Sequence, residues 1–293
     1  VYALAVIGTD VYAGGDFAAA GGVTANYIAK WNGSNWSALG TGTNGLVSAL
    51  AVSGTDVYAG GEFATAGGVA ANRIANWDGS SWSALGTGMD IIVSALAVIG
   101  TDIYAGGIFT TAGGVTVNCI AKWDGSHWSA LGTGMWGTGI SAWVYALTVS
   151  GTDVYAGGNI ITAGGVMVNN IAKWDGSGWS ALGSGTSGFA DRFDFQVNAL
   201  AANGTGIYCA GGWFDQARGV MVSNISKWDG SGWSALGSGM NGHVFALAVR
   251  GTDVYAGGDF ITAGGVTVNR IAKWNGTTLP NGTEATGLLW ERA

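Results

Sequence analysis

The sequence predicts an all-β protein, a six-bladed β-propeller of four-stranded antiparallel blades. Three observations predict it: one phrase recurs along the chain, each copy holds four strand-like segments, and Gly, Asn or Asp bounds those segments. Aligning the 293 residues on Gly-Thr-Asp, which is Gly-Thr-Gly in the fifth copy, gives six copies. They start at Gly8, Gly54, Gly100, Gly151, Gly204 and Gly251, so the intervals are 46, 46, 51, 53 and 47 residues.

The first segment of each copy alternates bulky and small residues, as in "VYALAV" at the start of the chain. Alternation puts Tyr2, Leu4 and Val6 on one face and Val1, Ala3 and Ala5 on the other. The second segment is "DVYAGG", the third is "NYIAKW" in copy one, and the fourth is "WSALG". β-Branched and aromatic residues at this spacing are typical of strands.

The turns set the connectivity of a copy. Asn-Gly or Asp-Gly after the third segment predicts a two-residue type I′ hairpin, because glycine adopts positive φ. Gly-Thr-Asp predicts a second tight turn, in which the aspartate bonds its own backbone. The longer "AGGVTAN" loop joins the second and third segments. Each copy is therefore expected to be a four-stranded antiparallel meander.

One such sheet cannot bury both of its faces, whereas six in succession can pack face against face around an axis. A linear stack of sheets is the alternative, and four strands per copy favour the propeller. The expected blades are residues 1–43, 44–89, 90–138, 139–189, 190–240 and 241–276, followed by a divergent tail at 277–293.

"DVYAGG" followed by paired tryptophans resembles a kelch blade, in which a diglycine ends the second strand and an aromatic pair follows. The copies look closer still to the propellers of fungal cortical polarity-marker proteins and related bacterial secreted repeats, which carry phrases like "GGxFxxAGGxxxNxIAxWDGxxWSxLG". The resemblance covers residues 1–276, although Trp31 replaces the usual kelch tyrosine and lies closer to Trp36. It implies a propeller fold and an extracellular setting, and no reaction.

Composition excludes several classes of protein. Only 10% of residues are charged and 48% are hydrophobic, which excludes a disordered chain. No apolar run reaches the length of a membrane span. The net charge of −7 and the lack of a Lys/Arg cluster argue against nucleic acid or anionic membranes as partners. Without an initiator Met or a signal-like segment, the chain is expected to be a processed form or a fragment.

Fifteen tryptophans raise the question of sugar binding, since aromatic faces stack on sugars. Eleven of them occupy two repeated places, Trp31 and Trp36 in copy one. An element present at every blade is expected to serve packing. The four that break the repeat are better functional candidates: Trp136, Trp143, Trp213 and Trp290.

Three departures from the repeat fall in neighbouring copies. The connections after copies three and four read "TGMWGTGISAW" and "SGTSGFADRFDFQ", and the second-to-third loop of copy five reads "WFDQARG". In an up-and-down blade these connections and loops share one end, so we expect an aromatic and charged surface that binds a protein or a glycan. Its residues are Trp136, Trp143, Phe189, Asp191, Arg192, Phe193, Phe195, Trp213, Asp215 and Arg218. The alternative is neutral drift, with aromatics that only fasten the loops.

No catalytic set is evident, so the chain is expected not to be an enzyme and to carry no cofactor. Neither His127 nor His243 belongs to a recognisable Ser–His–Asp set. Asp191 and Asp215 could supply the carboxylate pair of a glycosidase, which we keep as a minor alternative.

Acidic residues follow the glycine pair in only three copies, at Asp16, Glu62 and Asp259, so a full ring of metal ligands is not expected. Calcium at a single blade is left open. The asparagines before the third segment are expected to bond loop backbone. They are Asn26, Asn72, Asn118, Asn169 and Asn269.

The two cysteines, Cys119 and Cys209, lie two blades apart and are expected to be free, buried thiols. The phrase "IYCAGG" has one residue more than "VYAGG", which predicts a β-bulge at Cys209. Lys30 and its equivalents are expected to be solvated.

The sixth copy breaks off and continues as "TTLPNGTEATGLLWERA". Either "TGLLWERA" folds back as a substitute fourth strand, or blade six has an open edge that attracts another chain. The second case predicts homo-assembly through the blade-six edge and the tail, and a truncated end is its alternative. Sequons permit glycosylation in a secreted setting. They occur at Asn32, Asn35, Asn203, Asn224, Asn275 and Asn281.

These observations favour a non-catalytic propeller, extracellular or at the cell surface, that acts as a structural or adhesion module through protein contacts. A carbohydrate-binding lectin that uses the aromatic loops of blades three to five is the alternative.

Overall fold

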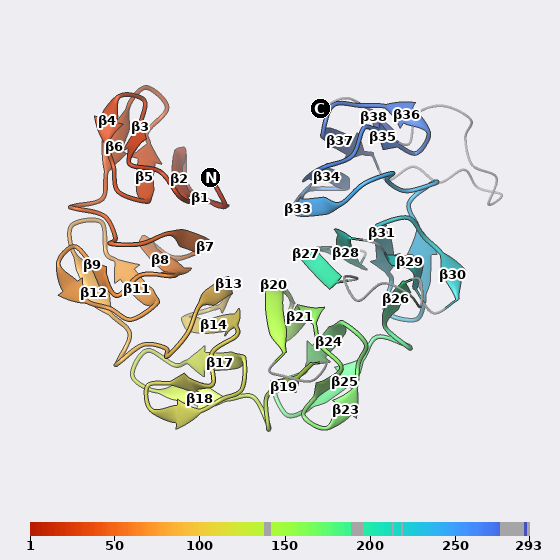
Figure 1. The fold of residues 1–293 in the computed structure, drawn as a ribbon, viewed down its shortest axis with the longest axis horizontal. Coiled ribbons are helices and arrows are strands. Elements are labelled where there is room, and N and C mark those ends of the chain that lie inside the picture. The colour runs from red at the N-terminus through yellow and green to blue at the C-terminus, as the bar shows by residue number, and fades with distance from the viewer. Residues whose placement is uncertain are drawn as a thin grey trace. The chain divides into compact units, whose positions relative to one another are not determined.

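The computed structural model describes residues 1–137, 142–188, 196–204, 206–212, 214–217, 219–275 and 290–291. It contains six four-stranded antiparallel sheets, which we call blades one to six, and the predicted count of blades and strands is confirmed (Figure 1). The residues form two compact units, Val1–Leu147 and Thr148–Ala293, and the division falls within the first strand of blade four.

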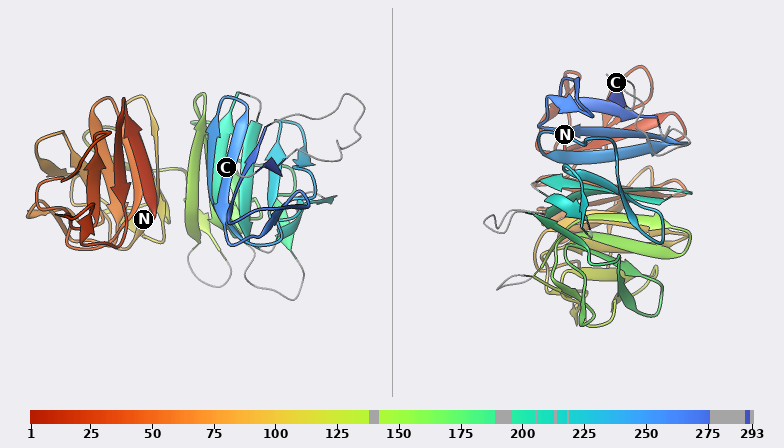
Figure 2. Two further views of the ribbon diagram at one scale, coloured as in Figure 1. Left: turned by 90° about the horizontal axis from the view of Figure 1, so that it is seen from above. Right: turned by 90° about the vertical axis from the view of Figure 1, so that its right-hand side faces the viewer.

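Blades one to three belong to unit one, and their neighbouring strands run in alternating directions (Figure 2). Blade one consists of β1 (Ala3–Ile7), β2 (Asp10–Gly14), β5 (Ile28–Trp31) and β6 (Trp36–Ala38). Blade two consists of β7 (Val47–Ser53), β8 (Asp56–Gly61), β11 (Ile74–Trp77) and β12 (Trp82–Ala84). Blade three consists of β13 (Val93–Ile99), β14 (Asp102–Gly107), β17 (Ile120–Trp123) and β18 (Trp128–Ala130).

The remaining three blades repeat this order. Blade four consists of β20 (Trp143–Ser150), β21 (Asp153–Asn159), β24 (Ile171–Trp174) and β25 (Trp179–Ala181). Blade five consists of β27 (Gln196–Asn203), β28 (Gly206–Gly212), β31 (Ile225–Trp228) and β32 (Trp233–Ala235). Blade six consists of β33 (Val244–Arg250), β34 (Asp253–Gly258), β37 (Ile271–Trp274) and β38 (Trp290–Glu291).

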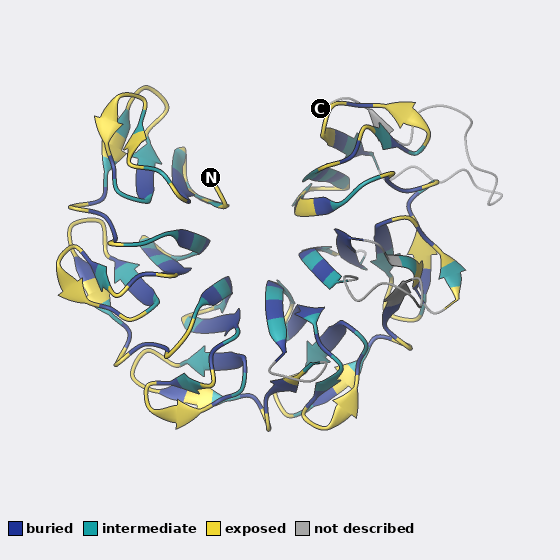
Figure 3. Cartoon of the chain, in the orientation of Figure 1, coloured by how far each residue is buried: buried dark blue, intermediate teal, exposed yellow. Residues whose placement is uncertain are grey.

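Each second-to-third loop folds into a short hairpin, which the sequence reading did not anticipate. The hairpins are β3 (Ala19–Ala20) with β4 (Val23–Thr24), β9 (Thr65–Ala66) with β10 (Val69–Ala70), β15 (Thr111–Ala112) with β16 (Val115–Thr116), β22 (Thr162–Ala163) with β23 (Val166–Met167), β29 (Phe214–Ala217) with β30 (Val220–Met221), and β35 (Thr262–Ala263) with β36 (Val266–Thr267). Two strands, β19 (Met135–Trp136) and β26 (Thr186–Gly188), lie in the connections after blades three and four. The hairpins carry much of the exposed surface (Figure 3).

The turns differ in part from their prediction. Gly8 has φ 60° and forms a two-residue turn with Thr9, because Ile7 pairs with Asp10. The third-to-fourth turn was wrongly predicted as a two-residue type I′ turn. It has four residues, since Trp31 pairs with Trp36, and Gly33 has the expected positive φ of 93°.

The aspartate of Gly-Thr-Asp makes an ion pair across the sheet. Lys30 Nζ lies 2.6 Å from an Asp10 carboxylate oxygen, and the same distance separates Lys122 from Asp102 in blade three. About a third of each lysine side chain is exposed, and the charge pair is screened accordingly. The lysines are therefore paired as well as partly solvated.

The apolar core lies between consecutive blades. One core cluster of unit one joins Ile28 and Leu39 of blade one to Val47, Phe63 and Trp82 of blade two. Equivalent clusters join blades two and three, and blades five and six. We call the face of a blade that packs on the preceding blade its leading face, and the opposite face its trailing face.

In blades one to four the first glycine of the glycine pair receives a valine from the next blade. A Cβ atom on Gly14 would lie 2.5 Å from Cγ1 of Val47, and one on Gly60 would lie 2.5 Å from Cγ1 of Val93. In unit two the corresponding contact of Gly157 with Val197 would be 2.4 Å. Two blades depart from this pattern among the described residues: Ala210 holds the place in blade five and packs in one cluster with Val244, and a Cβ atom on Gly257 of blade six would meet nothing within 4 Å.

The second tryptophan of a blade ties that blade to the one before it. Trp82 Nε1 donates to Leu39 O at 2.8 Å, Trp128 Nε1 donates to Leu85 O at 2.8 Å, and Trp233 Nε1 donates to Leu182 O at 2.9 Å. These rings are buried, and each lies against the first tryptophan of its own blade, with centroids 5.3–5.4 Å apart. The prediction that the repeated tryptophans serve packing is confirmed.

Blade five has no bulge at Cys209, so that prediction was wrong. Strand β28 pairs with β31 without interruption from Ile207 to Ala210. The register shift in blade five lies on β27, between Val197 and Ala199, and blades two, three and six share it. The extra residue of copy five lengthens the loop that contains β29.

The edge of blade six is paired. Strand β38 pairs with β37, matching Trp290 to Trp274 and Glu291 to Lys273. Of the two alternatives for the tail, the structure shows the substitute fourth strand.

Replacing Trp128 with Phe is expected to lower the free energy of unfolding by about 0.5–1.5 kcal/mol, because the indole hydrogen bond to Leu85 O is lost while Gly88 N still donates to that carbonyl. Trp36→Phe is the matched control: among the described contacts its indole makes no such bond, so a change below about 0.5 kcal/mol is expected. Urea unfolding followed by circular dichroism measures both. Equal losses in the two variants would contradict a role for the bond.

Candidate functional site

The structure describes three of the ten residues predicted to form a binding surface: Trp136, Trp143 and Asp215. The other seven lie outside the described residues. They are Phe189, Asp191, Arg192, Phe193, Phe195, Trp213 and Arg218. The gathering of all ten, and the carboxylate pair of Asp191 with Asp215, therefore stay predictions.

Connections between blades do meet the second-to-third loop of the next blade, as expected. Thr43, after blade one, forms a β-bridge with Ala66 in the hairpin of blade two. Met240 and Ala263 form the same bridge in unit two. A residue in a connection is thus placed beside a hairpin.

The residue after this bridge clamps the hairpin. Asn44 Oδ1 accepts hydrogen bonds from the backbone N–H groups of Ala64 and Thr65, at 2.8 and 2.9 Å. Asp90 does the same in the next connection, and Asn241 does so in unit two. Three connections therefore carry a side-chain acceptor at one position.

Trp136 stands at this position in the connection after blade three. An indole has no acceptor oxygen, so it cannot make the clamp that Asn44 makes. Its side chain is 51% exposed. Among the described residues of the predicted surface, Trp136 has the strongest features of a recognition residue.

Trp143 makes packing contacts. Its ring stacks on Tyr145, with centroids 4.9 Å apart and planes at 22°, and its Nε1 donates to Ser94 Oγ at 2.9 Å. Trp143 is half-buried. These contacts support the alternative that this aromatic residue fastens its segment.

Asp215 lies in β29 and is half-buried. Its backbone carbonyl accepts a hydrogen bond from Val222 N at 2.8 Å, which closes the hairpin of blade five.

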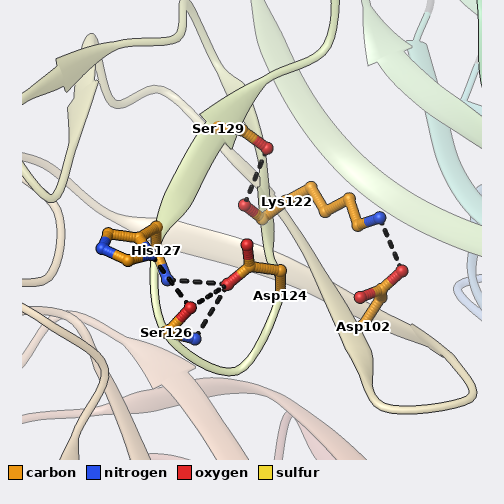
Figure 4. Close-up of polar contacts among 6 residues, drawn as sticks. All are labelled: Asp102, Lys122, Asp124, Ser126, His127 and Ser129. Atoms are coloured by element: carbon orange, nitrogen blue, oxygen red, sulfur yellow. Dashed lines mark hydrogen bonds and ion pairs between the residues drawn. The ribbon is translucent and has the colours of Figure 1, made fainter.

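Asp124, Ser126 and His127 come together in the third-to-fourth turn of blade three (Figure 4). Asp124 Oδ1 accepts from the N–H groups of Ser126 and His127 and from Ser126 Oγ, and Ser126 Oγ lies 2.9 Å from His127 Nδ1. A catalytic triad needs the carboxylate on the imidazole and the imidazole on the nucleophile. Here the carboxylate binds the serine and the backbone, which is the arrangement of a turn.

The same turn recurs without a histidine. Asp175 Oδ1 accepts from Ser177 N, Ser177 Oγ and Gly178 N, and Asp229 accepts from the matching groups of Ser231 and Gly232. The backbone N–H groups, with the serine hydroxyl, lower the pKa of Asp124, Asp175 and Asp229 to about 2. They also hold the pKa of Asp78 in blade two well below its usual range.

The recurring asparagines bond loop backbone, as predicted for four of the five. Asn26 Nδ2 donates to Thr41 O at 3.0 Å. Asn72, Asn118 and Asn169 make the same bond to Thr87, Thr133 and Ser184.

Three of the sequon asparagines make described side-chain hydrogen bonds: Asn32, Asn224 and Asn203, whose Nδ2 donates to Tyr208 OH and Gly251 O at 3.4 Å. Asn32 Oδ1 accepts from Ser34 N and Asn35 N in the turn of blade one. Asn224 is buried, and its Nδ2 donates to the carbonyls of Met240 and Gly242. The glycosylation nitrogen of Asn224 is thus occupied in the fold. Asn281 lies outside the described residues.

Both cysteines are free and buried, as predicted. Burial raises the pKa of the Cys119 thiol to about 12, and its Sγ donates to Ala142 O at 3.0 Å. Burial raises the pKa of Cys209 as well.

Within the described part of the chain, no three His, Cys, Asp or Glu residues are placed to hold a metal ion. Asp259, one of the acidic residues after the glycine pair, pairs with Arg270. No helix among the described residues has the length and apolar character needed to cross a membrane.

The widest departure from the buried pattern is the leading face of blade one. Leu4 is 64% exposed and Val6 is 55% exposed, whereas Leu96, at the equivalent place in blade three, is buried. Val1 and Tyr2 are exposed beside them. Sequence reasoning placed Val1 on the face opposite Leu4, but in blade two their equivalents Val47 and Leu50 both approach Gly14, because a register shift lies between Val47 and Ala49.

Comparison with known proteins defines the fold and no family. No protein-family model matches the chain, and no curated protein matches it either. The chain resembles the crystal structure of the computationally designed Ika8 protein, with a TM-score of 0.55, 18% identity, and 97% of this chain and 72% of that chain covered. The designed Ika4 protein has a TM-score of 0.38 and 16% identity, over 64% of this chain and 94% of that one.

The sheets and the first of these likenesses define the class: an all-β, six-bladed β-propeller with four-stranded antiparallel blades. Its described surface offers an exposed tryptophan, Trp136, and the exposed apolar residues of β1 as candidate sites. The clamp residues that mark Trp136 as exceptional could have been found from sequence, because Asn44, Asp90 and Asn241 each follow a Gly-Thr or Gly-Met pair.

The four turn aspartates predict a loss of stability in acid. Their pKa values are lower in the folded chain than in the unfolded chain, so their contribution is present above about pH 4 and is lost as the pH falls towards 2. Changing Asp78, Asp124, Asp175 and Asp229 together to Asn keeps the acceptor, as Asn32 shows in blade one, and removes this titration.

Urea midpoints at pH 7, 4 and 2.5 measure the effect. The wild type is expected to lose more stability between pH 4 and 2.5 than the fourfold variant. Identical pH dependence in the two proteins would contradict the assignment.

Proposed function

We propose that this chain is a non-catalytic structural or adhesion module that works outside cells or at the cell surface, through protein contacts. The exposed leading face of blade one carries the proposal. A contiguous apolar face on a folded protein is typical of an interaction site.

The repeat supports this function. Val47 and Val93, the equivalents of Val1, are fully buried by the preceding blade, so the residues of this face are of the type used in the interior. Burying one side chain of the size of Leu4 is worth roughly 1.5–3 kcal/mol. Covering the whole face with another protein surface is therefore favourable.

The resemblance to particular families of propeller repeats is also part of this proposal. The diglycine strand, the paired tryptophans and the "WSALG" phrase support a kelch-like blade close to the fungal polarity-marker and bacterial secreted repeats. That kinship supports an extracellular setting.

The double variant Leu4→Glu with Val6→Glu tests the function. Sedimentation velocity from 1 to 200 µM, on the order of typical weak interfaces, measures self-association, and a panel of immobilised extracellular-matrix proteins measures contacts with others. The wild type is expected to associate with itself or with a panel protein. The double variant should weaken that contact at least about tenfold, because charges cannot enter an apolar interface without loss.

The control places the same charges elsewhere. Val69→Glu with Val115→Glu changes two exposed hairpin valines of unit one and should leave association unchanged. A wild type that stays monomeric and binds no panel protein would end the proposal, and so would equal losses in both double variants.

A lectin is the second candidate, favoured by the exposed Trp136. A fluorescently labelled wild type applied to a glycan array is expected to bind sugars with exposed apolar faces. Trp136→Ala should reduce that signal at least about tenfold, because the stacking of the sugar on the ring is lost. Trp136→Phe should keep part of the signal. Unchanged glycan binding in Trp136→Ala, or none in the wild type, would remove this candidate.

A further inference from the structure

We propose that blade two binds a primary ammonium group beside Asp56, Tyr58 and Asn76. A small free amine and the lysine side chain of another protein both carry this group. The inference goes beyond the proposed function and uses none of the residues that carry it. The three residues lie inside unit one, in a blade that packs on a neighbouring blade at each of its faces.

The lysine of the third strand shows how a blade holds an ammonium group. In blade three, Lys122 Nζ lies 2.6 Å from a carboxylate oxygen of Asp102 (Figure 4). The same nitrogen lies 6.0 Å from the ring centroid of Tyr104. The bond to Asp102 raises the pKa of Lys122, and the negative charge of Asp124 adds to this effect. Three groups of the blade therefore act on one ammonium: a bonded carboxylate, an aromatic ring and a second carboxylate.

The arrangement recurs in two other blades. In blade one, Lys30 Nζ lies 2.6 Å from Asp10 and 5.8 Å from the ring centroid of Tyr12. In blade four, Lys173 Nζ lies 2.6 Å from Asp153. The carboxylate distance is the same in all three blades, so the fold of the blade sets the place of the ammonium group.

Blade two keeps the groups that act on the ammonium but not the lysine. Asn76 pairs with Tyr58 in the register in which Lys122 pairs with Tyr104. Asp56 begins the second strand, as in the other blades, and Asp78 stands in the turn. None of the ion pairs among the described residues contains Asp56. Both carboxylates are therefore present in blade two without the lysine that they act on elsewhere.

Asn76 replaces the lysine only in part. Its Nδ2 donates to Asp56 Oδ2 at 3.1 Å, whereas its Oδ1 is buried and has no hydrogen-bond partner within the described part of the chain. A buried amide oxygen without a donor is unfavourable. Rotation of the amide turns this oxygen towards Asp56. An ammonium group has three N–H donors, so it can then bond the Asp56 carboxylate and the Asn76 oxygen together.

Tyr58 reports the uncompensated charge of Asp56. Burial raises the pKa of Tyr58, and the negative charge of Asp56 raises it further. Burial also raises the pKa of Tyr104, but there the charge of Lys122 opposes the rise. A bound cation restores that opposition in blade two, and the face of the tyrosine ring adds an attraction of its own.

An ammonium group fits this place better than a metal ion does. Among the described residues, no three side chains of His, Cys, Asp or Glu come together to hold a metal. The other blades place an ammonium, with its N–H donors, at the equivalent position. The chemistry of the site is therefore that of the lysine head group.

Titration of the ¹⁵N-labelled protein with propylammonium chloride tests the site by nuclear magnetic resonance. The amide signals of Asp56, Tyr58 and Asn76 should shift and saturate, with a dissociation constant of about 10–100 mM for a partly exposed ion pair. Tetramethylammonium chloride at the same concentrations is the control, because it has the charge but no N–H donor. It should shift these signals less and without saturation.

Two matched variants move the site within the chain. Asn76→Lys gives blade two the lysine of blade three, so the shifts caused by propylammonium should disappear. Lys122→Asn gives blade three the asparagine of blade two, so a second set of saturating shifts should appear at Asp102 and Tyr104. Both changes use residues that the repeat already holds at this position, so both variants should fold. Shifts that are absent in the wild type, or unchanged in Asn76→Lys, would overturn the proposal.

A short peptide with blocked ends and one lysine distinguishes the two sources of the group. Binding at least about tenfold tighter than that of propylammonium supports a partner's lysine side chain, and equal or weaker binding supports a free amine. The same peptide with its lysine acetylated has lost the ammonium charge and should not bind. Equal binding of the acetylated and unmodified peptides would contradict recognition of an ammonium group.

Discussion

The structure depends on one constraint: a small sheet with two apolar faces must have both of them covered. Within each unit the chain meets it by packing the leading face of one blade on the trailing face of the blade before. A valine enters the space above a glycine, and an indole N–H bonds a carbonyl of the preceding blade. The core therefore lies between repeats, and a change at one interface affects two blades, as in repeat proteins whose stability depends on contacts between neighbours.

Much of this fold could be predicted from the sequence, because its signals are local and repeated. Alternation in "VSALAV", the Gly-Thr-Asp turns and the paired tryptophans gave the strands, their order and the number of blades. The errors arose where several local solutions exist. Asn32 and its equivalents accept from the third and fourth residues of a four-residue turn, and a dipeptide such as Asn-Gly does not reveal that length. At Cys209 the extra residue was absorbed by the following loop, because an interrupted β28 would have broken its pairing with β31.

The candidate site was less predictable, for a physical reason. Trp136 could be identified as irregular, but its importance depends on the acceptor that Asn44, Asp90 and Asn241 supply at the same place. The exposure of Leu4 could not be predicted from sequence, because Leu96 lies in nearly the same local sequence and is buried. Exposure is a property of what lies next to a blade in space.

Exchange of the tryptophan indole protons tests the central claim most directly. If consecutive blades are held together by the described interface, the indole N–H groups of Trp82, Trp128 and Trp233 will exchange with deuterium as slowly as the backbone amides of their sheets, since both are released by opening of the blades. The indole N–H of Trp136, a residue that is 51% exposed, will exchange much faster. Nuclear magnetic resonance of the ¹⁵N-labelled protein resolves these signals. Equally fast exchange at all four indoles would contradict the account, because it would mean that the blades are not joined through these bonds.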